Sequence, residues 1–284
     1  MKTDDPNLKP QYRMPRVFGA LPGPRNVPKD KQGLPNRQRN IVVSVAMRAD
    51  EAALAELLPP NCTLHGEPIV TVTIMYLYNI GWLAGRGYNM ISVGLPIAHQ
   101  SASRGLLNGN FTAVVWENMA DPIITGREEL GFAKLYAEIP DPVMLGNACT
   151  GHAGWMGFPF LRLELSDLVE TSHDLPPMQG QFHYKYIPRT GRLGEPDVEY
   201  LEYAAPDGPA TGYGGLKVQR RLKGTGDIRF HHARWEDAPF QYPILNALAD
   251  IRLAECVAAT VTYLAAEGPI GDVAAGALMS VEPQ

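Results

Sequence analysis

The sequence predicts a β-rich fold, a barrel or a sandwich with a few short helices, and three observations lead to this class. Short apolar or alternating runs recur along the chain, at residues 41–47, 69–77, 90–97, 111–116, 160–168, 181–187, 227–235 and 257–264. Glycine and proline, 28 and 25 of the 284 residues, interrupt the chain often. Only two or three segments have a helical pattern. Frequent short strands between turn residues are typical of closed or two-layered β folds.

The first half of the chain alternates predicted strands with one short helix. Ile41–Met47 is a continuous apolar run of strand length, and residues 69–77 are rich in β-branched side chains. Between them Asp50 can cap a helix that reaches Leu58 and ends at the following prolines. A glycine-rich turn precedes the strand-like run 90–97, and the run 111–116 leads into the segment that carries the main candidate residue.

The second half is dominated by alternation of apolar and polar residues. Residues 160–168, 181–187 and 227–235 alternate with a period of two, which indicates a sheet with one face in water. A short helix around residues 244–250 and an apolar run at 257–264 complete the predicted elements.

Charge and proline divide the chain into an arm and a body. Residues 1–40 hold nine Lys or Arg against three Asp, whereas the whole chain has a net charge of -5. Residues 1–35 are therefore predicted to be an extended, Pro-rich basic arm, and its apolar side chains favour docking on a surface over disorder. The remaining length suits one large domain. Because Lys and Arg are not clustered, we expect no nucleic-acid partner.

Composition also bears on compartment and cofactor. No run of about eighteen apolar residues is present, so no membrane span is expected, and the N-terminus has no apolar signal segment. Cys62, Cys149 and Cys256 are few and far apart, which is typical of a reducing cytoplasm and gives no zinc or disulfide pattern. The histidines have no spacing typical of metal ligands, so we expect no metal.

Lys134 is the main candidate for chemistry. Thr125 and Gly126 are predicted to begin a helix, with Lys134 in or just after its last turn and Arg127 on the same face. The apolar neighbours of Lys134 would remove water from its amine, which lowers a lysine pKa and makes the neutral amine a nucleophile toward ketones. The alternative is a surface lysine whose stem lies on apolar groups and whose head is in water.

The block Gly126–Lys134 resembles the Gly-Arg-Glu, aromatic, Pro, Lys block of the acetoacetate decarboxylase family. Residues 116–122 are similar to the strand and acidic turn that precede this block, and Arg48–Pro59 is similar to an early strand-to-helix segment. The resemblance extends over roughly residues 36–265. It implies a closed, antiparallel, barrel-like sheet, a single domain over residues 36–284, a lysine that forms a Schiff base with a keto acid, and a homo-oligomer.

The resemblance also implies roles for other residues. Lys134 matches the Schiff-base lysine, and Arg39 or Arg37 matches the region of the carboxylate-binding arginine. Leu135 stands where the family has a second lysine that helps to lower the pKa of the first, and acetoacetate decarboxylase is itself the standard example of that effect. A lowered pKa of Lys134 would therefore depend on burial of its amine, with Arg127 supplying the positive charge in place of the second lysine.

Two carboxylates expected from the resemblance are replaced by neutral side chains. Thr73 and Met90 occupy their positions, and together with Tyr88 they are predicted to line the substrate pocket. Tyr88, Tyr76 and Tyr136 are also candidate proton donors, although burial as a core or rim aromatic is the common use of tyrosine. A pocket of this kind would be less acidic than the family pattern implies.

The leading hypothesis is a cytoplasmic lysine Schiff-base enzyme that decarboxylates a β-keto acid without metal or organic cofactor. The first alternative is an aldolase-dehydratase, in which the lysine forms a pyruvate enamine, joins it to an aldehyde and eliminates water. The second is a non-catalytic barrel that binds a small apolar acid or ketone.

Overall fold

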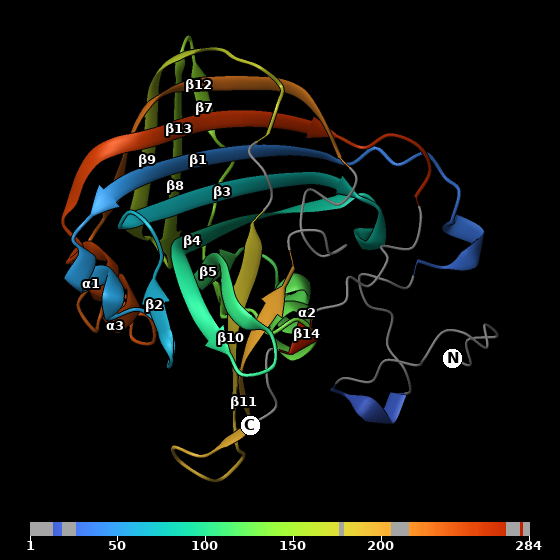
Figure 1. Cartoon of the computed structure of the whole chain (residues 1–284). Coiled ribbons are helices and arrows are strands. Elements are labelled where there is room, and N and C mark those ends of the chain that lie inside the picture. The colour runs from blue at the N-terminus through green and yellow to red at the C-terminus, as the bar shows by residue number, and fades with distance from the viewer. Residues whose placement is uncertain (1–13, 19–26, 176–178, 206–215, 271–278, 281–284) are drawn as a thin grey trace.

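The described residues form one large sheet with short helices around it (Figure 1). The structure, a computed structural model, describes residues 14–18, 27–175, 179–205, 216–270 and 279–280. Its helical elements are η1 Arg16–Phe18, η2 Lys29–Lys31, α1 Glu51–Ala55, η3 Gly81–Leu83, α2 Ala120–Glu128 and α3 Tyr242–Ala249. Its strands are β1 Arg39–Ala49, β2 Cys62–Leu64, β3 Ile69–Ile80, β4 Arg86–Ser101, β5 Gly105–Glu117, β6 Lys134–Tyr136, β7 Val143–Leu145, β8 Ala148–Trp155, β9 Phe158–Glu170, β10 Gly180–Pro188, β11 Pro196–Ala204, β12 Lys217–Phe230, β13 Leu253–Ala265 and β14 Met279–Ser280.

The sheet is mixed and mostly antiparallel, and its strands do not close into a ring. The strand order is β14-β11-β10-β5-β4-β3-β1-β13-β12-β9-β8-β7, with β2 on β4 and β6 on β5. Two pairings, β10 with β5 and β5 with β6, are parallel. The prediction of a β-rich fold is confirmed, whereas the prediction of a closed antiparallel barrel is wrong.

Prolines explain why the sheet stays open beyond β6. The chain after β6 meets β8 in a single isolated bridge, between Glu138 and Gly154. Pro140 and Pro142 follow at once, and proline has no N–H with which to continue a ladder. Beyond this bridge, no backbone ladder in the described part of the chain joins the half of the sheet that holds β5 and β6 to the half that holds β8 and β9, and side chains pack between the two halves.

Alternation along the strands creates the core. Val43, Ile74, Ile91 and Trp116 are opposite one another on β1, β3, β4 and β5 and are fully buried. The centre of the Trp116 ring lies 5.2 Å from that of Phe160 on β9, and this contact joins the two halves of the sheet. Burying an apolar side chain of this size contributes about 1.5–3 kcal/mol. The opposite face of the same strands carries the residues of the candidate site.

Most predicted elements are present with longer bounds. Strands occur at the apolar and alternating runs, although residues 227–235 are strand only as far as Phe230. Asp50 caps α1 by accepting from the backbone N–H groups of Ala52 and Ala53 at 3.0 and 3.3 Å, but α1 ends at Ala55, earlier than predicted. α3 confirms the second predicted helix. The strands that were not predicted are β2, β6, β7, β8, β11 and β14.

The described end of the N-terminal arm lies along the chain's own C-terminal segment. The backbone N–H of Gly33 donates to the carbonyl of Ile270 at 2.9 Å, and the N–H of Asn36 donates to the carbonyl of Gly268 at 3.0 Å. Docking is thus found for this part of the arm. Residues 1–13 and 19–26 lie outside the described residues, and docking across a subunit interface stays a prediction.

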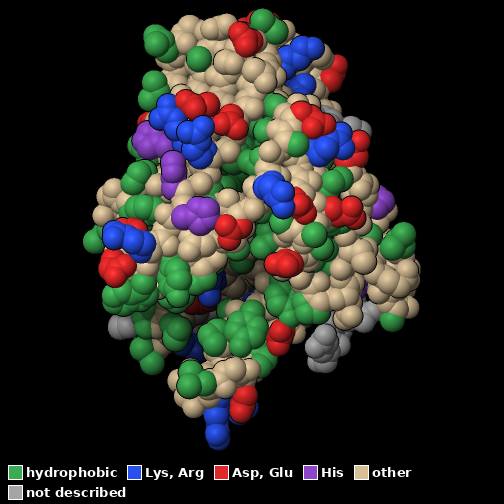
Figure 2. All heavy atoms as spheres, turned by 90° about the vertical axis from the view of Figure 1, so that its left-hand side faces the viewer, with side chains coloured by type: hydrophobic (Ala, Val, Ile, Leu, Met, Phe, Trp, Pro, Cys, Tyr) green, Lys and Arg blue, Asp and Glu red, His purple; other side chains and the backbone are tan. Residues whose placement is uncertain are grey.

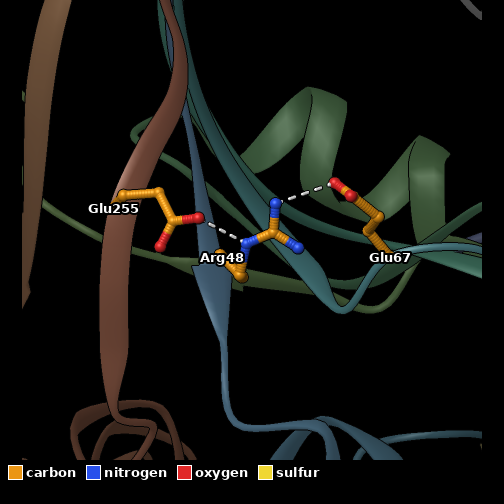
Figure 3. A network of polar contacts seen from close by, with 3 residues as sticks. All are labelled: Arg48, Glu67 and Glu255. Atoms are coloured by element: carbon orange, nitrogen blue, oxygen red, sulfur yellow. Dashed lines mark hydrogen bonds and ion pairs between the residues drawn. The ribbon is translucent and has the colours of Figure 1, made fainter.

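An exposed ion-pair network holds the end of β1 (Figure 3). Arg48 donates through Nε to Glu255 of β13 at 2.6 Å and through Nη2 to Glu67, before β3, at 3.2 Å. Because these side chains are in contact with water, the ion pairs contribute little to stability. The network links the end of β1 to β13 and to the segment before β3.

The surface gives no sign of a uniformly charged face in the view of Figure 2, where basic and acidic side chains are interspersed around a hollow bordered by apolar groups. None of the helices in the described part of the chain is long and apolar enough to span a bilayer.

Candidate active site

Lys134 is the first residue of β6 and does not lie on a helix, so the predicted helix was wrong. Helix α2 begins at Ala120 and ends at Glu128, with Thr125 and Gly126 in its last turn. Gly131 then takes a φ of +76°, a left-handed conformation that suits glycine, and the chain reverses into β6. Lys134 pairs in parallel with Val115 of β5.

Arg127 and Lys134 are in contact, although not through a shared helix face. Nη1 of Arg127 donates a hydrogen bond to the backbone carbonyl of Lys134 at 3.0 Å. Gly126 lies under the lysine side chain, and a Cβ at this position would be 2.3 Å from Cε and 2.5 Å from Nζ of Lys134. Only glycine at position 126 leaves room for the lysine in this conformation.

The amine of Lys134 is held in a buried, polar environment. Nζ donates to Oε1 of Glu117 at 2.7 Å and to the carbonyl of Pro122 at 3.1 Å. It lies 5.2 Å from the centre of the Phe132 ring. Lys134 is only 7% exposed and Glu117 is 0% exposed, so water does not screen the pair. The predicted alternative of a surface lysine with its head in water does not describe this site.

Glu117 is the functional candidate that the sequence interpretation missed. Burial raises the pKa of the Glu117 carboxyl, and the charge of Lys134 opposes this rise. Its second oxygen, Oε2, has no hydrogen-bond partner among the described residues. A charged carboxylate is therefore poorly solvated here. A single acid at the end of the apolar run 111–116 was a signal for it.

Strand register places Thr73, Tyr88 and Met90 on the same face as Lys134. Met90 is directly opposite Glu117. Tyr88 lies two residues away on β4, its ring is 6.5 Å from that of Trp82, and burial and the Glu117 charge raise its pKa. Thr73 is three strands from Lys134 across the sheet, about 14 Å at the usual strand spacing. It bonds to Ser44 rather than to the amine.

The two predicted carboxylate-binding arginines are not brought to the amine. Arg39 is exposed and lies opposite Tyr78, on the sheet face that carries Ile74 and the core. Arg37 is exposed and precedes β1. Their predicted role is untested by this geometry and stays a prediction.

Leu135 points away from the site. It is opposite Trp116 and packs against the core, because neighbours on a strand face opposite sides. The residue in the place of the second lysine therefore does not contact the amine of Lys134 from its strand position.

His183 is a second buried polar group that sequence interpretation did not assign. It lies on β10, is 3% exposed, and its ring centre is 3.8 Å from that of Phe132. Burial, together with the charge of Lys134, lowers its pKa to about 3. Nδ1 has no hydrogen-bond partner among the described residues. At neutral pH His183 is an uncharged ring behind Phe132.

In the described part of the chain, no cluster of three His, Cys, Asp or Glu could hold a metal ion.

Comparison with known proteins shows the family of the chain. The sequence profile described as "Acetoacetate decarboxylase (ADC)" matches residues 22–266. The chain belongs to the acetoacetate decarboxylase family. This membership confirms the resemblance drawn from the block around Lys134. A search of curated protein sequences found no significant match.

Solved structures share the fold of this family member at low identity. An acetoacetate decarboxylase structure aligns with a TM-score of 0.64 and 14% identity over 94% of this chain and 98% of its own. The enzyme from Legionella pneumophila subsp. pneumophila str. Philadelphia 1 aligns with a TM-score of 0.59 and 18% identity, over 95% and 98%. The enduracididine biosynthesis enzyme MppR, complexed with pyruvate, aligns with a TM-score of 0.59 and 16% identity, over 85% and 89%.

Proposed function

We propose that the protein is a lysine Schiff-base enzyme that decarboxylates a β-keto acid, with Lys134 as nucleophile and Glu117 as its proton partner. The observation that carries this proposal is the buried contact of 2.7 Å between Nζ of Lys134 and Oε1 of Glu117 in a member of this family. A buried pair of this kind joins a nucleophile to a group that can take and return its proton.

The amine must be neutral to attack a ketone, and Glu117 is the group that takes the proton. Its carboxyl is easier to protonate than an exposed one because burial raises its pKa. The nitrogen of Lys134 then bonds to the ketone carbon, and Glu117 protonates the oxygen that results. Glu117 next takes a proton from the nitrogen and returns it to the hydroxyl, which leaves as water. The product of these steps is an iminium on Lys134.

The iminium then accepts the electrons of the breaking bond. The carbon–carbon bond to the substrate carboxylate breaks, carbon dioxide leaves, and the electron pair forms an enamine. The enamine carbon takes a proton that originates in solvent and is delivered by Glu117, with Tyr88 as a second candidate donor. Water then adds to the iminium carbon, and the ketone and the free lysine are released.

The pocket residues in this proposal are those on the face of Lys134. Met90, opposite Glu117, supplies a neutral neighbour, which disfavours a carboxylate relative to the uncharged product, and Thr73 would line the pocket farther from the amine. Arg37 and Arg39 stay candidates for the carboxylate anchor, although each would have to reach the substrate from outside the amine's surroundings. We expect no metal or organic cofactor to take part.

A second candidate function uses the same two residues. One family relative of this fold, MppR, has been solved with "the condensation product of pyruvate and imidazole 4-carboxaldehyde". In an aldolase-dehydratase Lys134 would form the pyruvate enamine, and Glu117 would protonate the hydroxyl that is eliminated as water. The observation that favours it is the same buried acid, which dehydration requires beside the lysine.

Borohydride reduction in the presence of acetoacetate, longer 3-oxo acids and pyruvate tests the proposal. A reduced adduct on Lys134 blocks trypsin there, so the mass increase is expected in the peptide 128–162. Carbon dioxide release then identifies a decarboxylase, and a new ultraviolet chromophore from pyruvate and an aldehyde identifies an aldolase-dehydratase.

A Lys134→Met variant should form no adduct, whereas Lys223→Met, at an exposed position on β12, should react like the wild type. The proposal fails if folded wild-type protein gives no adduct with any of these acids, or if Lys134→Met retains full activity. Tight ligand binding without an adduct would instead support a non-catalytic binding protein.

A further inference from the structure

A small cavity lies behind the segment that precedes Lys134. Its volume is about 210 Å³, and it is lined by Arg127 at the end of α2, by the turn Gly131–Ala133, and by residues 184–187 of β10. Sites for drug-sized ligands have volumes of roughly 300–1,000 Å³. This cavity is therefore of a size for a short molecule such as a small keto acid.

Phe132 lies both at this cavity and close to the amine. It lines the cavity, its ring centre is 5.2 Å from Nζ of Lys134, and the His183 ring lies against it at 3.8 Å. An aromatic side chain can rotate about two torsion angles, and Phe132 is only partly buried. Movement of this one ring would connect the cavity to the amine.

Two cations line the cavity. Among the described residues neither Arg127 nor Lys185 forms an ion pair with a carboxylate; their hydrogen bonds go to backbone carbonyls, of Lys134 at 3.0 Å and of Glu128 at 2.9 Å. Glu202 interacts with Lys185, but burial raises the pKa of its carboxyl and so disfavours its charged form. The cavity is thus lined by positive charge and can attract the carboxylate of a keto acid.

We propose that this cavity is the access route for a short keto acid, that Lys185 and Arg127 attract its carboxylate, and that Phe132 is the gate through which the ketone reaches Lys134. The inference rests on the proposed Schiff-base chemistry and adds to it a route, a gate and a preference for short anionic substrates. It also provides cations near the amine, where Arg37 and Arg39 are not found.

The experiment compares an anionic and a neutral ketone in the full-length protein. The initial rate of adduct formation on Lys134 is measured with acetoacetate and with acetone, in the presence of cyanoborohydride. We expect Lys185→Gln to slow the reaction with acetoacetate by about tenfold and to leave the reaction with acetone unchanged. The matched control Lys223→Gln, exposed on β12, should change neither rate. Added salt should slow the acetoacetate reaction of the wild type more than that of Lys185→Gln.

Phe132 is tested with a smaller and a larger side chain. Phe132→Leu should increase both rates several-fold, and Phe132→Trp should decrease both. Thermal unfolding of each variant establishes that it is folded. If Phe132→Leu is not folded, the Lys185 comparison still tests the route and Phe132→Trp still tests the gate.

The results separate this inference from the proposed function. The route is overturned if Lys185→Gln changes both rates equally or neither, and the gate is overturned if folded Phe132→Leu slows both. In either case an adduct on Lys134 of the wild type leaves the Schiff-base proposal intact. The absence of any adduct in the wild type, with both probes, overturns the proposed function and this inference together.

Discussion

Nζ of Lys134 lies 2.7 Å from Oε1 of Glu117, and both side chains are buried. The ladder that places them is short: Lys134 is opposite Val115 on β5, two residues before Glu117 on the same strand face. Removing one member of a buried pair leaves an unpaired charge, which typically costs about 3–5 kcal/mol. The pair therefore affects both the stability of the fold and the reactivity of Lys134, and a substitution can separate these two effects.

Glu117→Gln should separate the effect on reactivity from the effect on stability most clearly. Glutamine can accept a hydrogen bond from Nζ but cannot take its proton, so we expect adduct formation on Lys134 to slow by about 10²-fold or more. The free energy of unfolding, measured with urea at pH 7, should fall by about 3–5 kcal/mol, because the substitution leaves the buried ammonium of Lys134 without its countercharge. Glu164→Gln, a half-exposed position on β9, is the control. Wild-type trapping rates in folded Glu117→Gln would contradict a proton-transfer role for Glu117.

Gly126→Ala should displace the lysine. The new methyl group would lie 2.3–2.5 Å from three atoms of the Lys134 side chain, closer than any van der Waals contact allows. Forcing such an overlap usually costs about 1–3 kcal/mol, so the protein should still fold. We expect the trapping rate on Lys134 to fall steeply, with Ile124→Ala, at an exposed position of the same helix, near the wild-type rate. Unchanged trapping in Gly126→Ala would mean that the lysine reacts from another conformation.

His183 should make stability depend on pH. Its folded pKa, about 3, lies below its ordinary value of 6.5, so the unfolded state binds more protons between these values. Its contribution is fully present above pH 6.5 and is lost as the pH falls toward 3. From pH 7 to pH 5 we expect a loss of about 2 kcal/mol in the free energy of unfolding. Urea unfolding at both pH values should show this loss in the wild type and not in His183→Gln.

The matched control for this measurement is His231→Gln, because His231 is exposed. It should lose as much stability as the wild type on acidification. If His183→Gln does so as well, the imidazole of His183 is not buried as a neutral group.

The sequence predicted most strands because buried strands are continuous apolar or β-branched runs and half-buried strands alternate with a period of two. Strand β3, for example, is rich in β-branched residues from Ile69 onward, and its buried residues, which include Ile74, belong to the core. Strand β8 was missed because residues 148–155 hold two glycines and few large apolar groups. Closure of the sheet was implied by resemblance, and Pro140 and Pro142, which prevent it, act on a pairing between distant segments that no local pattern reveals.

The candidate site was predictable only in part. Lys134 was found through the resemblance of its block, but the helix was placed too late because Thr125 and Gly126 look like a start. Helix α2 begins after Met119, which makes no side-chain cap, so its true start lacks the capping residue that Thr125 offered at the predicted one. Glu117 ends the apolar run of β5, the strand before β6, and that position was a signal for it. His183 joins the site through the pairing of β10 with β5, strands far apart in sequence, and a single histidine does not indicate such a meeting.

Leu135→Lys tests what the missing second lysine means. Position 135 lies opposite Trp116 and faces the core, away from the amine of Lys134. A lysine there would place a charge among apolar groups, at a cost of about 2–3 kcal/mol, and would not raise the trapping rate at neutral pH. Urea unfolding and adduct formation measure both effects, and Leu145→Lys, at an exposed position, is the control. A stable Leu135→Lys protein that traps keto acid faster at pH 7 would show that this position can reach the amine. Activation would then depend on a neighbouring charge rather than on Glu117 and burial.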